Sequence, residues 1–303
     1  MPSRAIKLGS APCQALSLAL ALAIGSAAAA QSTPRPLLWK VSDSDNSIYL
    51  LGSFHALKPT DYPLAPAVGA AFADAEVVAF EMSPEEMNSP SLGGKLVSAA
   101  RLPPGQTLKS TLPRAQWLRL ERYASRRGMS LDAYRGIEPW FVSMVISLGE
   151  MAANGYDPKI GLDQHLMGLA ATSDKRTRGL ESADDQIAAL DSMSPLEQQQ
   201  TLSETLDEAQ DPKGKIDELH DIWRAGDAAT LENVMGAELQ QKYPKLYKRI
   251  NVDRNQAWLP KLRAMLDDEK SDDAMVVVGS LHLVGTDGIV NQLKLRGYKV
   301  ERL

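Results

Sequence analysis

The apolar stretch YLLGSFHAL, residues 49–57, has a counterpart of the same pattern near the other end of the chain, VVVGSLHLV, residues 276–284. Each copy runs through residues that favour β-strands and continues Gly-Ser-apolar-His, which places His55 and His282 three residues after a glycine. Glycine lets the backbone turn sharply, and open α/β sheets bind ligands beyond the carboxyl ends of their strands. The repeat therefore predicts two strands, distant in sequence and adjacent in space, whose histidines share one crevice.

The remaining pattern divides the chain into strand-rich ends and a helical middle. Residues 37–53 predict a β-hairpin around the turn DSDN, and EVVAFEM (76–82) predicts a buried strand. Residues 274–303 predict a strand, a helix and a strand, whereas about 90–270 is mostly helical. One interruption is a short strand candidate in KRTRGLES, from residue 175, that ends at Leu180 or Glu181. We therefore expect an α/β protein with a mixed central β-sheet built from the N- and C-terminal segments. Helices should flank this sheet, and the middle should form a large helical insertion.

Residues 1–30 have the features of a secretory signal peptide. Arg4 and Lys7 precede an apolar segment shorter than the ~18–20 residues of a membrane span, and the alanines that follow predict cleavage after Ala30. An uncleaved anchor is the alternative. We expect a periplasmic or secreted protein, residues 31–303, that forms one domain and has no stable membrane anchor. Its only cysteine, Cys13, would leave with the signal peptide, so disulfides and thiol chemistry are excluded.

The charge of the chain argues against a nucleic-acid partner. The formal net charge is −5, and loss of Arg4 and Lys7 would make it −7. A mildly acidic chain without a basic run offers little to a phosphate backbone.

Three residues are the first candidates for a site. His55 and His282, offered to one crevice, suit a divalent metal or an acid/base pair, although each could be an ordinary hydrogen-bonded loop histidine. Glu81 is the one charge in the strand VVAFEM, where a carboxylate is costly unless it is paired, bound to metal or protonated. Its alternative role is to cap the helix expected from Pro84. Glu181 follows the short strand in a similar way, in more polar surroundings.

The segment DRNQAWLPKL adds Arg254, Asn255 and Trp258. On a helix Arg254 and Trp258 share one face, so a cation–π contact is expected, and Arg254 could clamp a carboxylate or stabilise an oxyanion. By spacing alone, a surface salt bridge is the simpler role for Arg254.

The other candidates carry weaker signals. Asp163 could support a site residue or act as a helix N-cap, and the cap is the simpler reading. His165 and His220 lie in helical, polar contexts and are expected on the solvated surface.

Five stretches together resemble the TraB/GumN family, which includes the Tiki-type Wnt-inactivating metalloproteases. They are LLWKVSDSDNSIYLLGSFHALKP, VVAFEM, IGLDQHLMGLAATSDKRTRGLESADDQ, DRNQAW and VVVGSLHLVGTDGIVNQLKLRGYKVERL. The resemblance implies a mixed α/β core like that of erythromycin-esterase and ChaN-like proteins, and for Tiki members it implies divalent-metal-dependent peptide hydrolysis.

Single residues can be carried over from the family. His55 and His282 match its two Gly-x-x-His motifs, Glu81 matches the acidic residue of the second core strand, and Arg254 with Asn255 matches its Arg-Asn pair. Many members have threonine after the motif glycine, where this chain has serine, so a hydroxyl is retained.

We therefore expect a metal-dependent, peptidase-like hydrolase acting on a peptide or protein. His55, His282 and Glu81 would hold Mn²⁺, Co²⁺ or Zn²⁺, and Arg254 would steady the oxyanion. Three alternatives stay open: a metal-free acid/base site of His and Glu, a protein that captures a peptide or haem without cleaving it, and an accessory protein of polysaccharide export.

Overall fold

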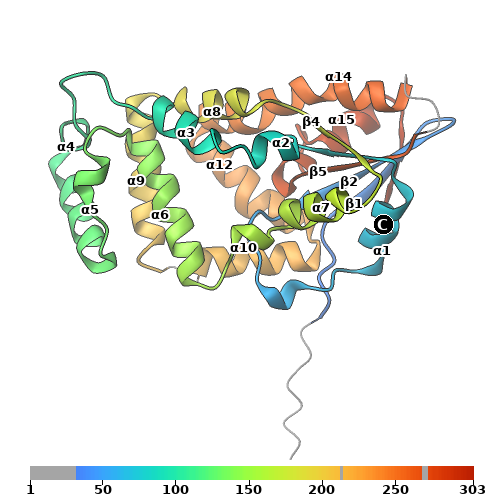
Figure 1. The fold of residues 1–303 in the computed structure, drawn as a ribbon, viewed down its shortest axis with the longest axis horizontal. Helices are drawn as coiled ribbons and strands as arrows, with labels where there is room; N and C mark the ends of the chain where they lie inside the picture. The colour runs from blue at the N-terminus through green and yellow to red at the C-terminus, as the bar shows by residue number, and fades with distance from the viewer. Residues whose placement is uncertain (1–31, 212–213, 268–271) are drawn as a thin grey trace, which may run out of the picture. The chain divides into compact units, whose positions relative to one another are not determined.

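A single mixed sheet organises the chain, which is shown in Figure 1 as a computed structural model that describes residues 32–211, 214–267 and 272–303. Its strands lie in the order β4-β3-β5-β2-β1-β6. They are β1 (Leu38–Ser42), β2 (Ser47–Ser53), β3 (Val77–Phe80), β4 (Arg176–Gly179), β5 (Ala274–Gly279) and β6 (Lys299–Arg302). The predicted signal peptide lies outside the described residues.

The α-helices occupy the connections between these strands. They are α1 (Pro66–Asp74), α2 (Pro84–Met87), α3 (Leu92–Ala99), α4 (Leu108–Thr111), α5 (Arg114–Arg127), α6 (Pro139–Ala153), α7 (Leu162–Ala171), α8 (Ala183–Asp191), α9 (Pro195–Glu208), α10 (Gly214–Ala225), α11 (Ala228–Leu231), α12 (Glu238–Lys242), α13 (Pro244–Tyr247), α14 (Arg254–Asp267) and α15 (Ile289–Leu295). None of those within the described ranges combines the length and apolar character needed to cross a bilayer.

Shorter turns complete the chain. Single turns of 3-10 helix are η1 (Pro59–Asp61), η2 (Leu131–Tyr134), η3 (Pro158–Ile160) and η6 (Ser280–Leu283). Two widened π-helical segments are η4 (Glu232–Ala237) and η5 (Lys248–Asp253), and η5 runs directly into α14. Such π turns often occur at functional sites.

The predicted adjacency of the two motif strands is confirmed. β2 and β5 are parallel neighbours, and β3 pairs in parallel with the other edge of β5. The predicted hairpin is also present as the antiparallel pair β1 and β2. Because three parallel strands end side by side, their following residues meet at one edge of the sheet.

Both faces of the sheet are covered by helices, because successive strand residues point to opposite sides. Val276 and Val278 face one core together with α14 and α15, whereas Met275 and Val277 face a second core with α1, α7 and Trp223 of α10. Residues buried on both faces explain why these strands read as continuous apolar runs.

The helical insertion has a core of its own. Helices α4, α5, α6 and α9 pack around buried residues that include Leu120, Val142, Ile146 and Leu202. Figure 1 shows α5, α6 and α9 grouped beyond the end of the sheet. The α/β class, the mixed sheet from both ends of the chain and the helical middle are therefore all confirmed.

Candidate functional site

His55, Glu81 and His282 meet beyond the ends of β2, β3 and β5. A Cβ atom placed on Gly279 would lie 3.1 Å from Nε2 of His55, 3.3 Å from Oε1 of Glu81 and 3.6 Å from Cδ2 of His282. One point in space is thus in contact with all three side chains. The structure brings together the three residues predicted first from the sequence.

The two motifs are not equivalent, because they are staggered by one residue. Ser53 of the first motif pairs with Gly279 of the second, so β2 continues one residue further while the second motif turns into η6 at Ser280. The Ser280 hydroxyl donates to the Ser53 carbonyl at 2.9 Å and joins the two strand ends. His55 and His282 therefore approach the same point from different backbone conformations.

His282 is buried, and both of its ring nitrogens are engaged. The amide nitrogen of Asn255 donates to the carbonyls of His282 and Asp287, so its Oδ1 is the atom that accepts from Nδ1 of His282, at 2.7 Å. Nε2 then carries a lone pair, which accepts from Nη1 of Arg254 at 3.0 Å. Burial lowers the pKa of His282 to about 3, Glu81 opposes this shift, and Arg254 reinforces it. His282 is a neutral, fixed ring.

His55 differs because one of its nitrogens faces the cavity. Nδ1 lies 2.8 Å from Oδ2 of Asp163, which also accepts from the Ser53 hydroxyl at 2.5 Å. No residue in the described ranges bonds Nε2. Asp163 raises the pKa of His55 to about 9, burial opposes this shift, and Glu81 adds to it. The side chain is 62% exposed, so solvent screens part of the attraction.

Asp163 reaches His55 because helix α7 begins against the backbone of His55. A Cβ on Gly161 would collide with the His55 carbonyl, so only glycine permits this approach. Gly161 is also the N-cap of α7, and Asp163 lies in its first turn. The expectation that Asp163 is the N-cap is therefore wrong, since its carboxylate holds the site histidine instead.

Glu81 is ionised and held on both oxygens. Oε1 accepts from the Gly279 amide at 2.7 Å, while Oε2 accepts from Arg254 at 2.6 Å and from Gln186 at 3.1 Å. Burial would raise the pKa of Glu81, but the charge of Arg254 outweighs it and the pKa falls to about 2. The alternative that Glu81 caps the next helix is wrong, because the Ser83 hydroxyl caps α2.

Arg254 joins these groups from the start of α14. Nη2 contacts Glu81 at 2.6 Å and Glu181 at 2.5 Å, Nε contacts Glu181 at 3.1 Å, and Nη1 donates to the Ile250 carbonyl and to His282. Its guanidinium lies 4.7 Å from the centre of the Trp258 ring, so the predicted cation–π contact is confirmed. The alternative of a surface salt bridge is wrong, since the Arg254 side chain is only 14% exposed.

A guanidinium has five N–H hydrogen-bond donors. In Arg254 the donors on Nε, Nη1 and Nη2 are all bonded to other residues of the protein. It is therefore a structural hub and has no donor left for an oxyanion. Burial also raises the pKa of Glu181, against the effect of Arg254.

The three predicted ligands do not form a metal centre as they stand. The nitrogen lone pair of His282 accepts from Arg254, whose positive charge would oppose a cation at that place. Within the described ranges, no group of three or more His, Cys, Asp and Glu side chains is placed to hold a metal ion. The donor set therefore does not fit a metal held by His55, His282 and Glu81.

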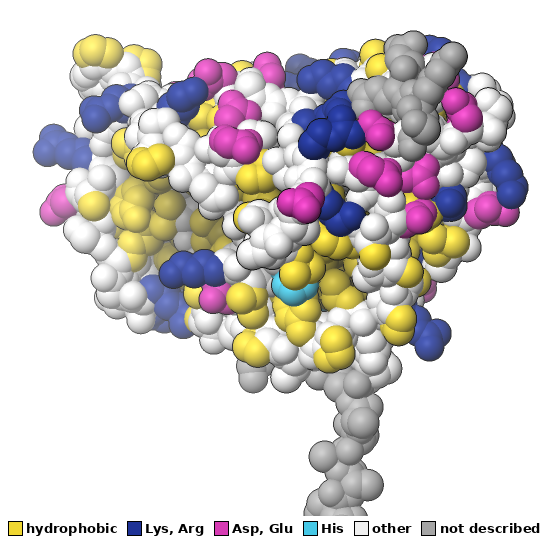
Figure 2. Space-filling model, turned by 45° about the vertical axis from the view of Figure 1, so that its right-hand side comes forward, with side chains coloured by type: hydrophobic (Ala, Val, Ile, Leu, Met, Phe, Trp, Pro, Cys, Tyr) yellow, Lys and Arg dark blue, Asp and Glu magenta, His cyan; other side chains and the backbone are white. Residues whose placement is uncertain are grey.

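A cavity of about 490 Å³ opens above the site. Its floor is polar and includes His55, Glu81 and Arg254, whereas its walls are mainly apolar. Those walls are Phe54, Met151, Ala189, Leu190, Ile216, Leu219, Trp223, Leu231, Met235, Ile250 and Leu281. Figure 2 shows a histidine ring in a hollow framed by hydrophobic side chains. An apolar pocket of this size with a few convergent polar groups suits an organic ligand.

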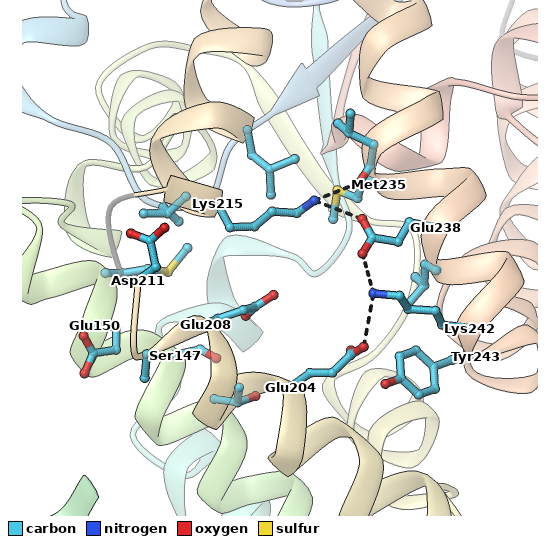
Figure 3. A pocket seen from close by; sticks show the side chains of 17 residues that line it. Ser147, Glu150, Glu204, Glu208, Asp211, Lys215, Met235, Glu238, Lys242 and Tyr243 are labelled. Carbon is cyan, nitrogen blue, oxygen red and sulfur yellow. Dashed lines mark hydrogen bonds and ion pairs between the residues drawn. The ribbon is translucent and has the colours of Figure 1, made fainter.

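A second cavity of about 300 Å³ adjoins the first and shares the walls Met151, Ile216, Leu219 and Met235. Figure 3 shows its charged lining, in which Lys215 contacts Glu238 at 3.0 Å and Lys242 contacts Glu238 at 2.6 Å. The chemistry of the strand ends lies in the first cavity, so we assign the candidate site there.

Two histidines were misplaced by the sequence analysis. His220 is 3% exposed, and its Nε2 lies 2.8 Å from Oδ2 of the buried Asp61, which also contacts Arg224. His165 is partly buried and packs 4.4 Å from the Tyr62 ring, and burial lowers its pKa. The expected solvated surface positions are wrong. The helical spacing of His220, Trp223 and Arg224 was the signal for one buried face.

This chain is an α/β protein whose candidate site lies at the carboxyl edge of a mixed sheet. Two strand-end histidines and a buried carboxylate define that site. Within the α/β class, the chain belongs to the TraB/PrgY/gumN family, whose family model matches residues 37–302. This confirms the resemblance.

Two relatives extend the comparison. The chain is 24% identical over 246 residues to "Uncharacterized protein YbaP" of Escherichia coli (strain K12) and equally to the protein of the same name of Shigella flexneri. The match covers 81% of this chain and 87% of each relative. No solved structure matches the chain.

Proposed function

We propose that this chain is a peptidase-like hydrolase whose proton-transfer group is His55, and that it acts in the periplasm or after secretion. The observation that carries the proposal is the position of His55, whose Nδ1 is fixed by Asp163 while Nε2 faces a ligand-sized cavity. An imidazole oriented in this way is a frequent general acid or base.

The charges favour His55 as the acid. With a pKa near 9 it carries a proton on Nε2 at neutral pH, and the ionised Glu81 lies beside the same point. In hydrolysis, water adds to the carbonyl carbon as the C–N bond breaks. The Nε2 proton passes to the leaving nitrogen, and the proton lost by water restores His55. Glu81 would orient the water, and Asp163 would stabilise the charged ring.

The test is hydrolysis of fluorescein-labelled casein by the full chain without residues 1–30. We expect turnover that EDTA does not remove, that His55→Ala abolishes and that falls as the pH rises through about 9. His165→Ala is the matched control, because that ring packs against Tyr62 and does not line the cavity.

A metal-dependent hydrolase is the second candidate. Three carboxylates, Asp163, Glu81 and Glu181, outnumber the cations Arg254 and His55, so the floor of the cavity carries a net negative charge. Such a metal would require His282 to give up its contact with Arg254. Turnover that appears only with added Mn²⁺, Co²⁺ or Zn²⁺ would establish this candidate and would contradict the metal-free acid.

Binding without turnover is the remaining outcome. Peptide capture with no cleavage under any of these conditions would contradict the hydrolase. Haem capture would give an absorbance band that His55→Ala removes, because His55 is the ring whose nitrogen is available to an axial ligand.

A further inference from the structure

Asn251 is buried in the wall of the site cavity, and its side chain has no hydrogen-bond partner of normal geometry in the part of the chain that the structure describes. It lies in η5, three residues before Arg254, and is 1% exposed. Within the described residues, neither its Nδ2 nor its Oδ1 makes a hydrogen bond of normal geometry. The Tyr247 side chain is the polar group that approaches it, and this interaction opposes the rise that burial causes in the Tyr247 pKa. A buried amide that leaves both a donor and an acceptor unused destabilises a folded chain, so it needs a reason.

Asn255 is a nearby buried asparagine whose side chain is fully hydrogen-bonded. It lies one turn further along, is also 1% exposed and uses both amide atoms, on His282 and on the Asp287 carbonyl. Of these two buried asparagines, four residues apart, Asn255 has hydrogen-bond partners and Asn251 has none among the described residues. The unpaired one lines the cavity.

We propose that Asn251 binds a backbone amide of the ligand. A carboxamide offers one donor and one acceptor, which complement the C=O and the N–H of a peptide group. The polar atoms of Asn251 are covered by the surrounding protein, so binding would turn the side chain toward the ligand within the widened turn of η5. This inference rests on the proposed function, because it takes the ligand of the cavity to be a peptide.

The cavity has room for an extended peptide with apolar side chains. Its walls are apolar, and four of their residues, Met151, Ile216, Leu219 and Met235, also line the second cavity. Methionine adapts to different side-chain shapes, which suits a chain whose sequence varies. Asn251 would supply the fixed contact, since every peptide presents the same backbone group.

The test compares N-acetyl-leucyl-leucine amide with its depsipeptide, in which an ester oxygen replaces the central N–H. Binding is measured by calorimetry in a His55→Ala background, so that turnover does not interfere. We expect the amide to bind about tenfold more tightly than the ester. The ester has no N–H, so it would leave the buried carboxamide oxygen of Asn251 without a hydrogen bond. Asn251→Leu should bind both equally, and Asn233→Leu, an exposed asparagine in η4, should keep the preference.

Thermal unfolding supplies an independent readout. Asn251→Leu should melt at or above the temperature of the parent protein, because it removes an unpaired amide, whereas Asn255→Leu should melt several degrees lower. Three results would overturn the inference: no amide preference in the parent, a preference that survives Asn251→Leu, or a loss of stability in Asn251→Leu that matches Asn255→Leu. If casein is not hydrolysed, the proposed hydrolase activity is rejected. The binding and melting measurements would still test whether Asn251 binds a peptide group.

Discussion

Replacing Arg254 by methionine should destabilise the fold strongly and in a pH-dependent way. The guanidinium contacts two carboxylates, Glu81 and Glu181, whose side chains are only 10% and 7% exposed. Methionine keeps an unbranched apolar stem and removes the charged guanidinium, so both carboxylates would remain buried without their cation. Breaking a buried ion pair from one side costs about 3–5 kcal/mol.

The structure gives a second route to this magnitude. Glu81 has its pKa lowered from 4.5 to about 2, which corresponds to about 3 kcal/mol in favour of the charged form. The native contribution of Glu81 is therefore present above pH 4.5 and is lost as the pH falls toward 2. Without Arg254, burial would raise the same pKa above 4.5, so the variant is weakest at high pH and recovers as the pH falls.

Urea unfolding at pH 7.5 and at pH 5, followed by circular dichroism, measures both effects. Arg263→Met on the same helix is the matched control, because its pair with Asp267 is exposed and worth at most about 1 kcal/mol. A loss below about 1 kcal/mol in Arg254→Met, or a loss equal at the two pH values, would refute the view of Arg254 as the hub of a buried charge network.

Three further predictions concern the residues around this hub. His55→Ala should reduce turnover by at least about a hundredfold with little change in melting temperature. His282→Ala should lower the melting temperature, because Arg254 and Asn255 would lose the buried ring that they hydrogen-bond. Equal stability losses in the two variants would contradict the asymmetry of the two motifs. Asp163→Asn should bring the His55 pKa from about 9 back toward 6.5, measured by NMR titration of the ring. The pH at which activity falls should move down by a similar amount. An unchanged titration would show that Asp163 does not set the pKa of His55. Asp61→Asn should destabilise the fold by about 2–5 kcal/mol in urea unfolding, because Arg224 and His220 would lose a buried carboxylate; a neutral result would mean that this cluster is solvated.

The sequence was sufficient for features that depend on local pattern. The hairpin, the apolar strands and the helical middle each follow from periodicity and turn residues, and the repeated Gly-Ser-x-His indicated that β2 and β5 are neighbours. The meeting of His55, His282 and Glu81 followed from that adjacency, because parallel strands end at a common edge.

Other features depend on contacts between distant segments and left no local signal. The one-residue stagger decides which histidine keeps a free nitrogen, and register is set by packing across the whole sheet. The role of Arg254 as a hub needs Glu81 and Glu181, which lie 173 and 73 residues away. Asn251 looked like any helical asparagine, since the widened turn that places it in the wall has no clear sequence mark.

The position of β5 also sets the order in which the site can be assembled during synthesis. β5 lies between β3 and β2, yet it follows them in the chain by nearly two hundred residues or more. A nascent chain that stops before Ala274 cannot join these two strands, so it has neither a continuous sheet nor the second histidine. The ribosome must release almost the whole polypeptide before the site exists. Truncated products therefore lack the candidate site, and folding must wait for contacts between distant segments.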